Sequence, residues 1–319
     1  MTTPGEAVAV AITVPPMPTG AERWWVYQRE RFPLAAHGPL VAAFSFSAVS
    51  FSSLLRREEA FPPWQNLAVS FVTALLFFLL LRIADEFKDF EDDSRWRPYR
   101  AVPRGLVKLR ELGVVAVFAG IIQVALAVAL SPGLLPYLLA VWVWLALMTK
   151  EFFVGDWLKK HPVLYMVSHM AIMPLIDLYA TACDWRVAGA PASHGLIWFL
   201  LVSFMNGIVI EVGRKLRAKE SEEEGVETYT ALWGTTTAPL VWVGAIIGTA
   251  VLALLAAREI RFVVPVACVL AVLVLTAAIV AVRFTRQPTK GNARLFEPIS
   301  GVWTLVMYLS LGAIPRFLQ

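Results

Sequence analysis

"ADEFKDFEDDSRWRPYRAVPRG", residues 84–105, directly follows an apolar segment of membrane-spanning length. Six carboxylates fall within the nine residues from Asp85 to Asp93. Asp85, Asp89 and Asp93 recur every fourth residue, so they share one face if the helix continues through them. Three stacked carboxylates repel one another unless a cation lies between them, and Mg²⁺ suits such hard oxygen ligands. We therefore expect Asp85, Asp89 and Asp93 to hold Mg²⁺.

The arginines that follow the carboxylates indicate an anion beside the metal. Guanidinium groups have the fork geometry that binds phosphate oxygens. The arginines of this stretch that we expect to bind a diphosphate are Arg97, Arg100 and Arg104. The alternative is a solvated loop of mixed charge beside the membrane. Regular four-residue spacing at the end of a membrane helix favours the metal–diphosphate site.

The composition is that of an integral membrane protein. Hydrophobic residues make up 58% of the 319 residues and charged residues only 16%, which predicts an all-α, polytopic bundle. The 2 cysteines and 4 histidines show no disulfide or metal-ligand pattern. With about 17–25 apolar residues per span, nine spans are expected near 38–55, 66–83, 112–130, 133–149, 162–181, 194–212, 237–257, 262–282 and 300–317.

The chain divides into a short tail and one membrane domain. We expect residues 1–32 to form a tail that contains a surface-lying helix at "ERWWVYQRERF", and residues 33–319 to form the membrane domain. Most of the 28 Lys and Arg residues fall on the side of the N terminus, which predicts that this side is cytoplasmic. The basic charge is explained by topology and anionic lipid, so no nucleic-acid partner is expected.

The acidic stretch resembles the first signature of the UbiA superfamily of membrane prenyltransferases, Asn-x3-Asp-x3-Asp followed by Arg-Pro and Pro-x-Gly. Asp85 stands at the usual Asn position, and "GVETYTALWG" at 225–234 resembles the end of the second signature. The resemblance implies a nine-helix bundle with a cytoplasmic cap over a central cavity. It also implies Mg²⁺-dependent transfer of a prenyl group from an isoprenyl diphosphate to a hydrophobic or aromatic acceptor within the bilayer.

The second signature departs from the family pattern Asp-x2-Asp-x3-Asp, which holds a second Mg²⁺. Its usual aspartate positions fall here on Arg214, Arg217 and Ser221. A three-residue insertion brings Glu211 onto the first position and makes it a catalytic candidate. In one interpretation Arg214, Lys215 and Arg217 bind the diphosphate directly in place of the second metal. In the other, Glu211 pairs with Lys215 at i,i+4 within an ordinary basic loop.

Three further residues are candidates for the site. Lys150, at the end of the fourth predicted span, is expected to reach a phosphate, and its alternative role is to anchor the topology. His169 and Asn206 lie within predicted spans, where polar groups are costly and often functional. We expect both to line the cavity and meet the acceptor. The alternative is that they hydrogen-bond neighbouring helices.

Other classes of membrane protein remain open from the sequence. A transporter is disfavoured, because its polar groups usually lie in broken helices at the midplane, not in charged stretches at helix ends. A terpene cyclase of the same fold would ionise the same donor and capture the cation within the molecule. A non-catalytic relative that binds a polyprenyl lipid is the stronger rival, because the second signature is altered.

Overall fold

The computed structural model describes residues 18–223 and 225–318, and every regular element in those ranges is a helix. Nine segments there are long and apolar enough to span a membrane, which confirms the predicted all-α architecture. The spans, in chain order, are α2 (Leu34–Leu55), α3 (Trp64–Lys88), α5 (Leu109–Leu130), α6 (Leu135–Thr149), α8 (Pro162–Met170) with α9 (Ile172–Trp185), α10 (Leu196–Arg214), α11 (Tyr229–Glu259), α12 (Val263–Arg286) and α14 (Phe296–Tyr308) with its flanking turns. The seventh predicted span, 237–257, lies within α11, which is broken at Gly234 (φ 82°, ψ 165°). The turn before this break begins where the Thr228 hydroxyl accepts a hydrogen bond from the Ala231 N–H.

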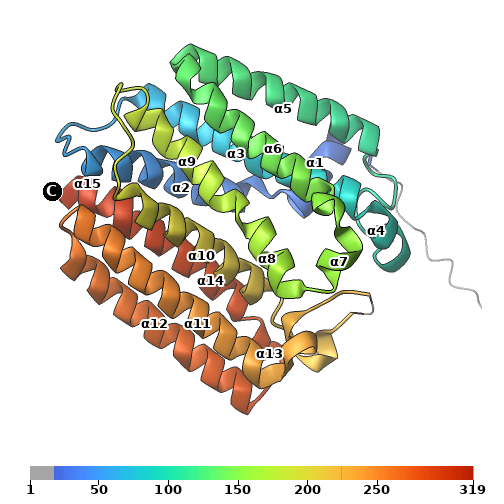
Figure 1. Ribbon diagram of the computed structural model, residues 1–319. Helices are drawn as coiled ribbons and strands as arrows, with labels where there is room; N and C mark the ends of the chain where they lie inside the picture. The colour runs from blue at the N-terminus through green and yellow to red at the C-terminus, as the bar shows by residue number, and fades with distance from the viewer. Residues whose placement is uncertain (1–17, 224, 319) are drawn as a thin grey trace, which may run out of the picture.

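The core of the bundle forms where α10 packs against α11 and α2 packs against α9. Tyr179, Phe199 and Trp242 are large side chains that are fully buried there. Helices α5 and α12 lie at the periphery (Figure 1). They expose apolar side chains such as Val117 and Leu275. Such an apolar outer surface suits contact with lipid.

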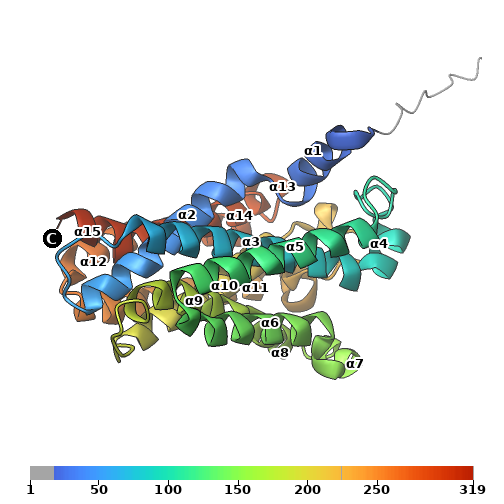
Figure 2. The same ribbon diagram turned by 90° about the horizontal axis from the view of Figure 1, so that it is seen from above.

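The two charged stretches lie at the same end of the bundle, which we call the motif end and define by residues 85–105, 211–223 and 225–230. The short helices α1 (Gly20–Arg31), α4 (Phe90–Trp96) and α7 (Gly155–Lys159) lie there, and the C terminus lies at the opposite end (Figure 1 and Figure 2). The segment "ERWWVYQRERF" is helical and forms most of α1, and its position at the membrane surface stays a prediction. Residues 1–17 of the predicted tail lie outside the described residues.

Polar side chains inside the bundle pair with one another. Asp177 on α9 accepts a hydrogen bond of 2.8 Å from the Tyr308 hydroxyl on α14, which also lies 3.1 Å from the Ser203 hydroxyl. Asn206 on α10 is fully buried, and its side-chain oxygen accepts a 3.1 Å hydrogen bond from the Trp303 indole. These bonds join α9 and α10 to α14 in a region where water cannot replace them.

The last span changes its winding after α14. Residues Leu309–Ala313 form a π-helical turn, η4, and α15 (Ile314–Leu318) follows. Gly312 of η4 packs directly on α2, where an added Cβ would lie 2.3 Å from both the Cα and the carbonyl oxygen of Ser47. Only a residue without a side chain permits this approach of two backbones.

Candidate active site

The acidic stretch is helical but is not one continuous helix. α3 ends at Lys88, Asp89 adopts φ −94° and ψ 7°, and α4 begins at Phe90. Backbone hydrogen bonds at four-residue intervals nevertheless cross this bend. The Asp89 N–H donates to the Asp85 carbonyl at 2.9 Å, and the Asp93 N–H donates to the Asp89 carbonyl at 2.8 Å. The four-residue register of the three aspartates is therefore kept.

Asp89 is the carboxylate whose surroundings most favour a cation. It is half-buried, and in the described ranges its carboxylate has no hydrogen bond or ion pair. Burial raises the pKa of Asp89, and the carboxylates of Asp85 and Asp93 raise it as well, against the opposing charge of Lys88. A divalent cation bound here would relieve both the burial and the repulsion.

Asp93, by contrast, already has cationic partners. Its carboxylate is buried and lies 2.7 Å from the guanidinium of Arg97 and 2.7 Å from that of Arg100. The neighbouring Glu86 is also buried and lies 2.5 Å from Arg31 of α1. Two of the arginines predicted to bind the diphosphate thus fold the loop after α4, and a buried ion pair attaches α1 to the end of α3.

Arg104 also binds a residue of α1 and so helps to attach that helix to the first charged stretch. Its guanidinium donates two hydrogen bonds, of 2.9 and 2.8 Å, to the carboxylate of Glu30 on α1. We expect Arg104→Met and Glu30→Gln each to lower the free energy of unfolding by no more than about 1 kcal/mol, because the pair is partly exposed. Unfolding of both single variants and the double variant in detergent measures this coupling. A loss of pyrophosphate affinity in Arg104→Met alone would instead return Arg104 to its predicted role as a diphosphate ligand.

In the second charged stretch, basic side chains pair with carboxylates of the same stretch. Glu211, buried at the end of α10, lies 2.5 Å from Arg214 and 2.8 Å from Lys215. The ion pair that was the alternative interpretation of Glu211 is therefore present. Arg217 lies 3.3 Å from Glu223 at the surface. All three basic residues predicted to replace the second metal have a carboxylate partner.

The other glutamates of this loop help to fold it. Glu222 accepts hydrogen bonds from the hydroxyls of Thr228 at 2.6 Å and Thr230 at 3.0 Å. Glu220 accepts a hydrogen bond of 2.7 Å from the Lys290 N–H at the start of α13 (Lys290–Ala293). Within residues 18–223 and 225–318, no three His, Cys, Asp or Glu side chains form a ready metal site.

Asp85 and Asp89 still fit one Mg²⁺. This ion usually keeps several waters and is held by one or two carboxylates together with substrate phosphates. Asp89 is unpaired, and the nearest cation to Asp85 is Arg82 at 3.5 Å. Asp93 fits less well, because two arginines occupy its oxygens. The donor set therefore suits a metal whose coordination the substrate completes.

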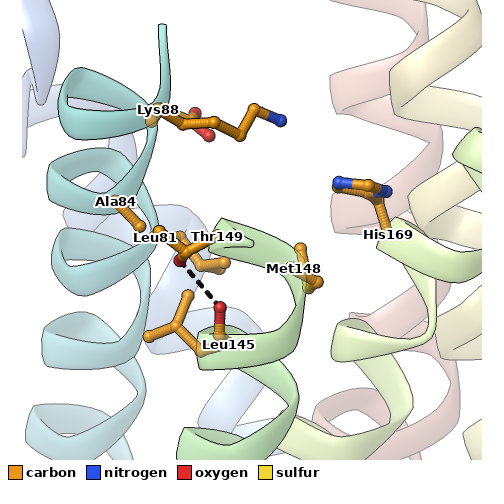
Figure 3. A pocket seen from close by; sticks show the side chains of 8 residues that line it. Leu81, Ala84, Lys88, Leu145, Met148, Thr149 and His169 are labelled. Carbon is orange, nitrogen blue, oxygen red and sulfur yellow. Dashed lines mark hydrogen bonds between the residues drawn. The ribbon is translucent and has the colours of Figure 1, made fainter. Parts of the chain in front are cut away.

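A small cavity of about 20 Å³ lies between α3, α6 and α8 (Figure 3). It is lined by Leu81, Ala84, Asp85, Lys88, Leu145, Met148, Thr149 and His169. His169, a predicted cavity residue, lines it, and its buried Nε2 has no hydrogen-bond partner among the described residues. Lys150 follows the lining residue Thr149 but is itself exposed. His169 and two residues of the first acidic stretch, Asp85 and Lys88, therefore line the same cavity.

A family model described as the UbiA prenyltransferase family matches residues 43–310, which include both charged stretches. The chain belongs to the UbiA prenyltransferase family. This confirms the resemblance first seen in residues 85–105 and 225–234. A search of curated proteins found no match to the chain.

Two solved structures share the fold of this UbiA-family chain. One, described as digeranylgeranylglyceryl phosphate synthase in membranes, has a TM-score of 0.64 and 13% identity, and the alignment covers 93% of this chain and 100% of that one. The other, an apo UbiA homolog from Aeropyrum pernix K1, has a TM-score of 0.65 and 12% identity, with coverage of 87% and 96%. Identities this low support a common fold and carry no substrate across.

Sequence reasoning missed Lys88 and Tyr165. Lys88 is the basic residue within the acidic stretch, three positions after Asp85, so the two share a side of α3. Its ammonium hydrogen-bonds the Tyr165 hydroxyl and lies 3.8 Å from Glu151 in η2 (Glu151–Phe153). Tyr165 in turn stacks on His169. The i,i+3 spacing of Lys88 from Asp85 is the sequence signal that could have identified Lys88.

Proposed function

We propose that this UbiA-family chain is a Mg²⁺-dependent prenyltransferase that moves a prenyl group from an isoprenyl diphosphate to a hydrophobic or aromatic acceptor. The observation that carries the proposal is the unpaired, half-buried Asp89 next to Asp85 at the end of an apolar bundle. Family membership supports the same class of activity. Asp85 and Asp89 would hold the ion. Bound there, Mg²⁺ would offset the charge that develops on the departing diphosphate.

Next to the cavity-lining His169, two aromatic rings suit the electron-poor carbon left when the donor C–O bond breaks. The diphosphate leaves with the electron pair of that bond, and an atom of the acceptor forms the new bond and releases a proton. The ring of Trp144 lies 5.4 Å from that of Phe152, which lies 6.0 Å from that of His169. Such ring faces stabilise positive charge, and the surrounding apolar helices exclude water from the cation.

His169 is placed to receive the released proton. Its Nδ1 lies 2.8 Å from the Tyr165 carbonyl oxygen, which can only accept a hydrogen bond. The ring hydrogen is therefore assigned to Nδ1, which leaves the lone pair of Nε2 free at the cavity. We infer that an acceptor bound beside His169 gives its proton to Nε2.

A non-catalytic relative that binds a polyprenyl lipid is the second candidate. The pairing of Glu211 with Arg214 and Lys215 favours it, because the carboxylate predicted to serve a second metal is then held by two cations. A terpene cyclase would share the ionisation step with a transferase and differ in the organic product.

The deciding experiment measures pyrophosphate released by purified protein in detergent. Geranyl, farnesyl and geranylgeranyl diphosphates are supplied with Mg²⁺ or with EDTA, and with or without a membrane lipid extract as the acceptor source. Release that requires Mg²⁺, together with a prenylated product, supports the transferase. A cyclic hydrocarbon as product supports the cyclase, and no release from any donor supports the lipid-binding relative.

A further inference from the structure

We propose that Lys88 binds the diphosphate of the donor and supplies part of the positive charge that the altered second stretch does not bring through a metal. The inference rests on the proposed function, because it concerns the same donor. It assigns a role to a residue that lies between two metal ligands in sequence, and whose side chain is directed into the cavity.

The first argument concerns the basic residues of the two charged stretches that were predicted to bind the diphosphate, all of which are paired with carboxylates. Arg97 and Arg100 bind Asp93, and Arg104 binds Glu30. The basic residues of the second stretch have carboxylate partners as well, namely Arg214 and Lys215 on Glu211 and Arg217 on Glu223. A diphosphate carries more negative charge than one Mg²⁺ offsets, so a further cation is needed close to the metal.

In the described part of the chain, two basic residues meet this requirement: Arg82, which lies 3.5 Å from Asp85, and Lys88, whose side chain lines the cavity. Lys88 lines it together with Asp85 and His169. Figure 3 shows its side chain extending from α3 towards His169 on α8, across the space between the two helices. The Lys88 side chain is only 16% exposed, so little water screens its charge. A phosphate oxygen next to Asp85 would therefore lie within reach of the ammonium group.

The present partners of Lys88 are ones that a diphosphate can replace. Tyr165 offers a hydroxyl, and its ring centroid lies 5.1 Å from the ammonium nitrogen. Glu151 is 3.8 Å away and is equally close to Lys159, so Lys88 is not its sole cation. A phosphate oxygen makes a stronger, charge-assisted bond than the tyrosine hydroxyl. The stack of Tyr165 on His169, at 4.0 Å, keeps the ring in place when Lys88 leaves it.

The test is the affinity of the full chain in detergent for inorganic pyrophosphate with Mg²⁺, measured by calorimetry and by the shift in thermal unfolding. Lys88→Met is expected to raise the dissociation constant at least tenfold, and Lys88→Gln is expected to do the same with a polar side chain in place. Tyr165→Phe keeps the stacked ring and removes the competing hydroxyl, so its dissociation constant should stay equal or fall. Lys160→Met removes an exposed ammonium at the same end and should leave the affinity unchanged.

The outcomes separate this inference from the proposed function. If the wild-type chain does not bind pyrophosphate with Mg²⁺, the donor class itself is wrong and both proposals fall. If the wild type binds and folded Lys88→Gln binds equally well, only the role of Lys88 is overturned. Weak binding by both Lys88 variants, with tight binding by Tyr165→Phe and Lys160→Met, establishes it.

Discussion

Replacing Asp89 by asparagine is expected to lower Mg²⁺-dependent pyrophosphate release at least 100-fold, or about 2.7 kcal/mol of transition-state stabilisation. The amide keeps the shape of the side chain and removes the charge that would hold the metal. Because the Asp89 carboxylate has no hydrogen bond or ion pair in the described ranges, its loss leaves no buried cation unpaired. The fold should therefore survive, and the measurement is release from the best donor over a Mg²⁺ titration.

Asp92→Asn is the matched control for Asp89→Asn. Asp92 is exposed, lies in the same acidic stretch and is assigned no metal role, so its loss should change release by less than about twofold. Asp85→Asn should raise the Mg²⁺ concentration needed for half-maximal release, because the second carboxylate ligand is lost. Full activity in Asp89→Asn with an unchanged Mg²⁺ response would contradict the assigned metal site.

Gly312→Ala is expected to produce the largest loss of stability, about 3 kcal/mol in the free energy of unfolding. The new methyl group would lie 2.3 Å from the Cα and the carbonyl oxygen of Ser47. Both are backbone atoms, so no flexible side chain can move aside. Either η4 must separate from α2 or the π-helical turn must rewind. Unfolding of the purified variant in mixed micelles, followed by circular dichroism, measures the effect.

Gly301→Ala provides the same chemical change one element earlier. Gly301 lies in α14, and an added Cβ there meets nothing within 4 Å. Alanine should be neutral or stabilise the helix by up to about 1 kcal/mol, since glycine is a poor helix former. Equal effects of the two substitutions would show that helix propensity, and not the contact with Ser47, sets the cost at Gly312.

The membrane fold was predictable from the sequence because it depends on the length and polarity of segments. Apolar runs with charged ends specify where helices cross a bilayer, and the boundaries of α5 and α6 lie close to those predicted. Helix α1 was predictable for a similar local reason. The break at Asp89 was not, because no Gly or Pro lies beside it and the four-residue spacing of the aspartates continues through the bend.

The partners of the charged residues were the least predictable part of the candidate site. Arg97 and Arg100 had the composition of phosphate ligands, but the fold turns both onto Asp93. Whether these arginines meet a phosphate or Asp93 depends on the path of the loop after α4. The spacing of residues in the sequence does not determine that path. Lys88 was overlooked for the converse reason. In the sequence, a lysine among carboxylates is explained by local charge balance alone. Only the fold shows that α8 places Tyr165 beside Lys88.

The hydrogen bond between Asp177 and Tyr308 also bears on how the chain is assembled in the membrane. The two residues are 131 positions apart, so ribosomes adding roughly 5–20 residues per second need on the order of ten seconds between them. An aspartate near the centre of a helix opposes insertion by about 2.5–3.5 kcal/mol. Until α14 is made, α9 carries a carboxyl group without its final partner. The buried carboxyl group of α9 therefore gains its partner only when α14 has been inserted, and a chain truncated before α14 would be a substrate for membrane quality control.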